Sequence, residues 1–215
     1  MRIRTASRRV RQVLATATLT VIAVAATACG ATGGSGSGSG AGAAPPPPDK
    51  KLFAEDFKPV CEGAPVSAAK PYDKAATGHK AVYMKTYKDS GLLDSSTELP
   101  ADWTVKFDAN GNVFSEVDLV VCAKRTSEKL AKRCDGYKVD DKPNALVVKM
   151  HTAKYTVTVH EATTGKELGR TTVAANDGAC PQSVFGIEQG TTEMNEYDSP
   201  PDEQIVAFAK TFIQP

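Results

Sequence analysis

The side chains in this sequence that are suited to catalysis or metal binding are three histidines and a group of carboxylates near the C-terminus. The histidines are His79, His151 and His160. His160-Glu161 begins like the H-E-x-x-H signature of a zinc site, but the second histidine is missing. If 155–160 is a strand, His160 lies on its water-facing side, so we expect His151 and His160 to be exposed rather than paired across a hairpin. The spacing therefore predicts no metal, no cofactor and no catalytic residue.

The carboxylates are concentrated in one short segment, and they are Glu193, Glu196, Asp198, Asp202 and Glu203. Paired carboxylates can exchange protons with a substrate, or they can bind a cation or a basic partner. A helix capped by Asp198 or Ser199 also explains Asp202 and Glu203, because acidic residues stabilise the positive end of a helix. That explanation leaves Glu193, Glu196 and Tyr197 as candidate partner-binding residues in a polar loop over 191–197.

The beginning of the chain has the organisation of an export signal. Residues 1–12 are basic, and 13–28 are apolar but too short and too weakly apolar for a comfortable membrane span. The run Ala-Thr-Ala-Cys that ends at Cys29 resembles the lipobox of a bacterial lipoprotein. This resemblance implies that 1–28 is a signal peptide and that Cys29 carries a thioether-linked diacylglycerol and palmitate. The protein would then be lipid-anchored on the extracytoplasmic face of the cell membrane.

Residues 29–49 form the lipid anchor and a tether of Gly, Ser, Ala and Pro, and 50–215 form a single extracytoplasmic domain. The tether reaches about 20 Å through its flexible part and about 12 Å through its four prolines. Removal of five arginines with the signal peptide leaves 21 basic and 25 acidic residues. That acidic balance argues against a nucleic-acid partner.

Four cysteines remain in the exported part, namely Cys61, Cys122, Cys134 and Cys180. An even number in an exported protein predicts two disulfides, whereas a zinc site would need closer C-x₂₋₄-C spacing. We favour Cys122–Cys134, which would close a short loop between two strands, together with Cys61–Cys180, which would tie the start of the domain to its end.

A basic segment lies between Cys122 and Cys134 and contains Lys124, Arg125, Lys129, Lys132 and Arg133. We expect it to be a solvated loop closed by a disulfide. Its functional alternative is contact with an anionic surface of the envelope, such as an envelope protein or polymer.

Alternation of apolar and polar residues predicts several strands separated by polar turns. The candidate strands are 80–87, 103–107, 117–123, 137–139, 145–151, 155–162 and 167–173. The run 117–123 is the most apolar and should be central. An apolar stripe of Ile205, Phe208, Ala209 and Phe212 predicts an amphipathic C-terminal helix. We therefore expect a mainly β to α+β fold, an antiparallel meander sheet or sandwich packed by that helix.

Several stretches of the domain resemble a known kind of secreted domain. They are Leu99-Pro100, Val121-Cys122, Cys134, residues 155–165 and Cys180-Pro181. With them the chain resembles a disulfide-containing domain of predicted lipoproteins from high-GC actinobacteria. The resemblance covers most of the mature chain and implies export and paired cysteines, but it brings no catalytic residues with it.

Three functions are compatible with these observations. The first is a non-catalytic, lipid-anchored binding or interaction module of the cell envelope. The second is an envelope hydrolase that uses the carboxylates of 191–203 or the histidines. The third is a structural or inhibitor-like envelope domain with a protein partner. A concave pocket that joins a histidine to those carboxylates would favour the enzyme.

Replacement of Cys29 tests the anchor. We expect Cys29→Ser to release the domain from membranes or to block maturation, because the apolar run alone is a poor span and the acyl chains supply the attachment. Membrane fractionation of wild type and mutant measures this, and a correctly processed mutant that stays fully membrane-bound contradicts it.

Overall fold

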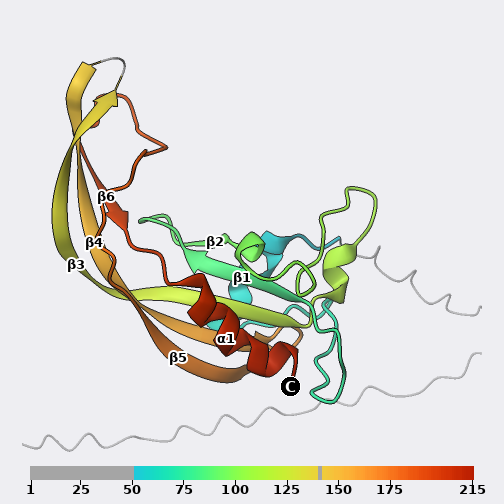
Figure 1. Cartoon of the computed structure of the whole chain (residues 1–215). Coiled ribbons are helices and arrows are strands. Elements are labelled where there is room, and N and C mark those ends of the chain that lie inside the picture. The colour runs from blue at the N-terminus through green and yellow to red at the C-terminus, as the bar shows by residue number, and fades with distance from the viewer. Residues whose placement is uncertain (1–50, 140–141) are drawn as a thin grey trace, which may run out of the picture. The chain divides into compact units, whose positions relative to one another are not determined.

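The computed structural model describes residues 51–139 and 142–215, which belong to one compact unit. The expectations for the signal peptide, Cys29 and the tether lie outside these residues. The 3-10 helices are η1 (Ala54–Glu62), η2 (Ser96–Glu98) and η3 (Val113–Glu116). The strands and the helix are β1 (Ala81–Thr86), β2 (Leu92–Asp94), β3 (Leu119–Val139), β4 (Lys142–Glu161), β5 (Glu167–Ala175), β6 (Glu193–Tyr197) and α1 (Asp202–Ile213) (Figure 1).

The strands form one mixed sheet, so the fold is mainly β with a C-terminal helix, but the predicted antiparallel meander is wrong. The strand order is β2-β1-β3-β4-β5, and β6 pairs with β4. β1 runs parallel to β3, and β6 runs parallel to β4. These parallel pairs are possible because the connections 95–118 and 176–192 are long. Each of them lets the chain reverse its direction before the next strand starts.

β3 and β4 are unusually long and pair with each other over nearly their whole length. Only the first part of β3 also pairs with β1, and only the last part of β4 pairs with β5. Beyond this flanked part, residues 126–139 of β3 and 142–152 of β4 extend from the core as a projection, which we call the arm, and β6 pairs with part of its β4 edge (Figure 1). The predicted basic loop 124–133 is therefore the middle of a strand.

The flanked part of the sheet is covered on both faces. On the helix face, Val121 and Val157 belong to a buried cluster that also holds Trp103 and the α1 residues Ile205 and Ala209. This cluster confirms that the C-terminal helix packs on the sheet. The segment 103–107 does not form the predicted strand, because Trp103 enters this cluster whereas the side chain of Phe107 is exposed.

On the opposite face, Val120 and Cys122 pack against Phe57 and Val60 of η1. A third cluster stabilises the arm on this face, where the loop 176–192 covers it. Its buried members are Cys134, Leu146, Val148 and Met150, and Val184, Ile187 and Met194 pack against them.

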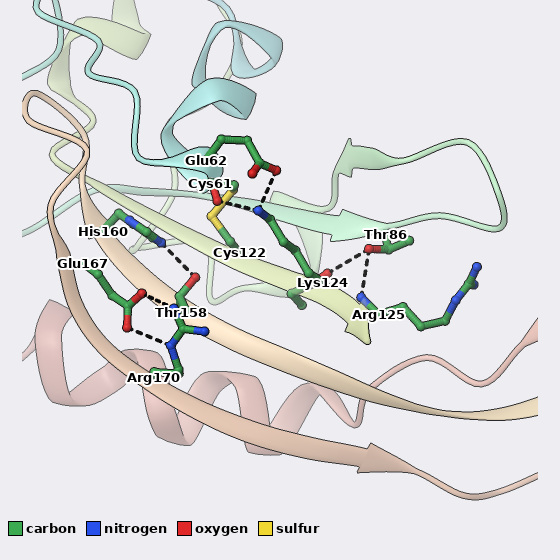
Figure 2. A network of polar contacts seen from close by, with 11 residues as sticks. Cys61, Glu62, Thr86, Cys122, Lys124, Arg125, Thr158, His160, Glu167 and Arg170 are labelled. Atoms are coloured by element: carbon green, nitrogen blue, oxygen red, sulfur yellow. Dashed lines mark hydrogen bonds and ion pairs between the residues drawn. A yellow bond between two sulfur atoms is a disulfide. The ribbon is translucent and has the colours of Figure 1, made fainter. Parts of the chain in front are cut away.

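All four cysteines described here form disulfides, but the predicted pairing is wrong. The bonds are Cys61–Cys122, which ties η1 to β3, and Cys134–Cys180, which ties the arm to the loop 176–192 (Figure 2 shows the first). Cys122 and Cys134 cannot pair because both lie in β3, where twelve extended residues separate their Cα atoms by about 40 Å. Each of these two cysteines therefore bonds to a cysteine outside β3, Cys122 to Cys61 and Cys134 to Cys180.

Peptide mapping without reduction should find Cys61–Cys122 and Cys134–Cys180. The two bonds span 61 and 46 residues. Loss of either one should lower the free energy of unfolding by about 4 kcal/mol in the chain-entropy model. Denaturant titration of Cys61→Ala/Cys122→Ala and of Cys134→Ala/Cys180→Ala measures this. A Cys122–Cys134 peptide would contradict the continuous β3 strand.

Candidate functional site

The turn that joins β1 to β2 reaches across the sheet and contacts β6. The carboxylate of Asp89 accepts hydrogen bonds from Arg125 Nη2 at 3.1 Å and from the Tyr197 hydroxyl at 2.8 Å. Lys88 Nζ lies 2.6 Å from a carboxylate oxygen of Glu196. These contacts bring together segments that are about a hundred residues apart in the sequence, and they fix the turn over the base of the arm.

Arg125 and Tyr197 form the centre of this contact. The guanidinium of Arg125 lies 3.4 Å from the centroid of the Tyr197 ring, and the imidazole of His151 lies 5.1 Å from the same ring. The Arg125 side chain is only 10% exposed and also pairs with Glu128 at 3.0 Å. A buried cation held by two carboxylates and an aromatic ring is strongly constrained in position.

A cleft of about 440 Å³ opens beside this contact. One wall consists of residues 85–88, 93–95 and Glu98, and the other consists of Tyr155, Tyr197 and Ser199. Lys85 Nζ is bonded to both carboxylate oxygens of Glu98, at 2.5 and 2.7 Å. The cleft therefore presents two paired lysines and the carboxylate of Asp94, together with the hydroxyls of threonine, serine and tyrosine.

Several buried polar atoms around the cleft have no hydrogen-bond partner among the described residues. They are the Tyr83 hydroxyl, Arg125 Nη1 and both ring nitrogens of His151. Tyr83 precedes Lys85 by two residues in β1, and Arg125 and His151 both contact Tyr197. A buried donor or acceptor without a partner costs about 1–3 kcal/mol, so these groups favour a polar partner beside the cleft.

The tyrosines of this region stay protonated far above neutral pH. Burial, assisted by the hydrogen bond to Asp89, raises the pKa of Tyr197 to about 12. Burial and the nearby Glu98 carboxylate raise the pKa of Tyr83, and burial raises that of Tyr155 against the opposing effect of Arg125. Their hydroxyls are therefore neutral hydrogen-bonding groups rather than bases.

The structure brings the two predicted partner-binding segments together but pairs most of their charges. Arg133 and Lys149 both bind the carboxylate of Glu193, at 2.6 and 2.5 Å, and these contacts lower its pKa. Lys124 Nζ bonds to the backbone oxygen of Cys61 and to Glu62 at the end of η1 (Figure 2).

Lys129 and Lys132 differ from the other basic residues of the segment. They are exposed on the arm and have no ion pair within 51–139 or 142–215. They are the predicted basic residues whose charge stays available to a partner.

The histidines do not occupy the cleft. His79 is buried, with Nδ1 2.7 Å from Asp118 Oδ2. The expectation of an exposed His160 is wrong, because it is 6% exposed and bonds to the backbone oxygen of Gly165 and to Thr158 Oγ1. Figure 2 shows the contact with Thr158. Its side of β4 is dry because η1 and its neighbours cover the same face as Cys122. His151 is not exposed either, because it is half-buried beside Tyr197 and both its ring nitrogens are buried.

The other predicted carboxylates, Asp198, Asp202 and Glu203, have structural roles. Asp198 does not cap α1, which has Pro201 at its N-cap, but accepts a hydrogen bond from the Gly178 amide at 2.7 Å. Burial raises the pKa of Asp198. Asp202 and Glu203 lie in the first turn of α1, as predicted. In the described part of the chain, no group of three or more His, Cys, Asp or Glu side chains is placed to hold a metal ion.

Sequence reasoning found Arg125, Glu196 and Tyr197 but missed Lys85 and Glu98. One signal was present for Lys85, which follows Ala81 and Tyr83 on the inward-facing side of an apolar strand. A charged residue at such a position needs a partner. The partner itself could not be identified, because Glu98 comes from a separate short helix.

Comparisons with protein-family models, with curated proteins and with solved structures gave no match. Among the described residues, no helix has the length and apolar character needed to cross a membrane.

Titration of Tyr197 tests the geometry of the site. Its pKa should be about 12, compared with 10.0 for an unperturbed tyrosine. Because the folded-state pKa is raised, the contribution of this group to stability should decline as the pH rises through that interval. Asp89→Asn should lower the pKa, since it removes the carboxylate that the hydroxyl binds. NMR of labelled tyrosine, assigned with Tyr197→Phe, measures both, and an unchanged pKa in Asp89→Asn contradicts the contact.

Proposed function

We propose that this protein is a lipid-anchored binding module of the cell envelope and that the cleft is its ligand site. The observation that carries the proposal is the cleft itself, where the β1–β2 hairpin, β4 and β6 meet around paired lysines and neutral hydroxyls. Its volume of about 440 Å³ falls within the range of small-ligand sites. A short segment of an envelope polymer or protein is a ligand of suitable size.

The lining indicates the kind of ligand. Lys85 and Lys88 are each neutralised by a carboxylate, so a free anion would have to displace an ion pair, and the carboxylate of Asp94 accepts hydrogen bonds from Ser96. The hydroxyls of Ser95 and Ser199 remain as adaptable donors and acceptors, whereas the Thr86 hydroxyl is held by Ala123 O and the Arg125 amide. A neutral ligand rich in hydroxyl or amide groups fits this chemistry best, because it can hydrogen-bond without disturbing those pairs.

The surroundings hold the cleft in shape before any ligand arrives. Arg125 and Asp89 fix the turn to β6, and Cys134–Cys180 fixes the loop that leads into β6. Pre-ordering of this kind reduces the entropy lost on binding. The polar residues around the cleft thus have the arrangement expected of a recognition site.

The hydrolase alternative has less support from the geometry. The cleft is lined by none of the three histidines and by none of the carboxylates from 191–203 in the described part of the chain. Glu193 is held by two basic side chains, and Asp198 accepts a backbone amide. The binding module is therefore the function that we propose.

A bulky residue in the cleft tests the proposal. Ser199 is exposed at the wall of the cleft, so Ser199→Trp should fold normally and fill part of the cavity. Ser183→Trp is the matched control, because Ser183 is an exposed serine that does not line the cleft. The probes are solubilised cell-wall polymer and detergent-extracted envelope proteins, offered to the full-length protein. We expect Ser199→Trp to weaken capture at least about tenfold and Ser183→Trp to leave it unchanged.

Three outcomes contradict this proposal. Equal capture by both tryptophan variants would exclude the cleft. Loss of capture in Lys129→Glu/Lys132→Glu, but not in Ser199→Trp, would move the site to the arm. Turnover in a hydrolase screen that disappears in Glu193→Ala or Glu196→Ala would favour the enzyme instead.

A further inference from the structure

Two phenylalanine side chains lie together on the surface at the end of the sheet opposite to the arm. Phe53 is 48% exposed and Phe107 is 66% exposed, and their ring centroids are 6.4 Å apart in a stacked arrangement. We call this pair the Phe patch. Adjacent exposed phenylalanines are costly in water, and their area becomes favourable when an apolar phase covers it.

The described chain begins at the Phe patch. Lys51 Nζ donates a hydrogen bond to the backbone oxygen of Ala109 at 3.1 Å, and the Leu52 amide donates one to Asn112 Oδ1 at 2.8 Å. Leu52 itself is buried. Residues 51 and 52 are thus fixed to the loop that follows Phe107, and whatever precedes them in the chain must arrive at this place.

We propose that the Phe patch rests on the outer surface of the bilayer to which the chain is anchored through Cys29. The inference depends on the anchor in the proposed function and adds an orientation to it. The segment 29–49 has a reach of about 30 Å, so the patch stays close to the bilayer at high effective concentration. A contact that is too weak to hold a free protein on a membrane is then sufficient.

The charges near the patch show which force would hold it there. Lys51 and Lys106 are exposed, but Asp108 lies in the same loop and Lys58 pairs with Glu55. Since positive and negative side chains are balanced, attraction to anionic lipids contributes little and aromatic burial dominates. Contact should accordingly be insensitive to salt and to the fraction of anionic lipid.

This orientation has a consequence for the arm. The loop that carries Phe107 leads through η3 into the first residue of β3, whereas the arm is formed by the last residues of the same strand (Figure 1). A bilayer at the Phe patch therefore leaves the arm pointing away from the membrane. The exposed Lys129 and Lys132 are then presented to the space beyond it.

Tryptophan fluorescence in vesicles tests the contact. The full-length lipidated protein is reconstituted in phosphatidylcholine vesicles with brominated acyl chains, and its single native tryptophan, Trp103, provides the background signal. The variants are Phe107→Trp and, as a control, Phe185→Trp, because Phe185 is 73% exposed in the loop 176–192 beside the arm. We expect brominated lipid to quench the added emission of Phe107→Trp at least about twofold and that of Phe185→Trp hardly at all.

Further measurements separate the possible outcomes. Acrylamide in the water should quench Phe185→Trp more than Phe107→Trp, and Phe53→Ser should weaken the lipid quenching of Phe107→Trp. Absence of lipid quenching at Phe107→Trp overturns the proposal. Protection from acrylamide without lipid quenching also overturns it, because a second copy or a protein partner would then cover the patch. Failure of the wild type to stay on vesicles contradicts the anchor rather than the patch.

Discussion

Pairing between β3 and β4 is the constraint on which the rest of the structure depends. The two strands pair along the whole of β3, from Leu119 to Val139. Only the first part of this ladder is flanked by other strands at both edges and covered on both faces. The arm lies outside that core and needs its own support. It obtains this support from the cluster around Val148, from the Cys134–Cys180 bond and from β6.

The cleft forms where the supported part of the ladder becomes the arm. β1 ends near Arg125, so its turn is free to lean over the ladder, and Asp89 reaches Tyr197 on β6. Burial of Arg125 at this junction would be costly without the two carboxylates and the ring that contact it. The ion pairs beside the junction also neutralise Lys85 and Lys88 of the cleft, and this pairing is why we infer a polar, uncharged ligand.

How far the sequence could predict this arrangement depended on the surroundings of each segment. The C-terminal helix was predictable because its apolar stripe packs on one surface. The polar composition of 124–133 predicts a loop although the segment is a strand, because residues 126–133 of β3 are exposed to water on both faces. That error also produced the wrong disulfide pairing. The cleft was not predictable, since its walls come from segments that only the tertiary fold brings together.

The central claim is that Arg125 and Tyr197 hold the β1–β2 turn, the ladder and β6 together as one preformed site. A double-mutant cycle on Arg125→Met and Tyr197→Leu, measured by equilibrium denaturation, tests it most directly. The account predicts a coupling energy of about 1 kcal/mol or more between the two residues. Either single change already removes their shared contact, so the double mutant should lose less stability than the sum of the two single mutants. Additive effects, with no coupling energy, would show that the walls of the cleft are independent and would contradict the account.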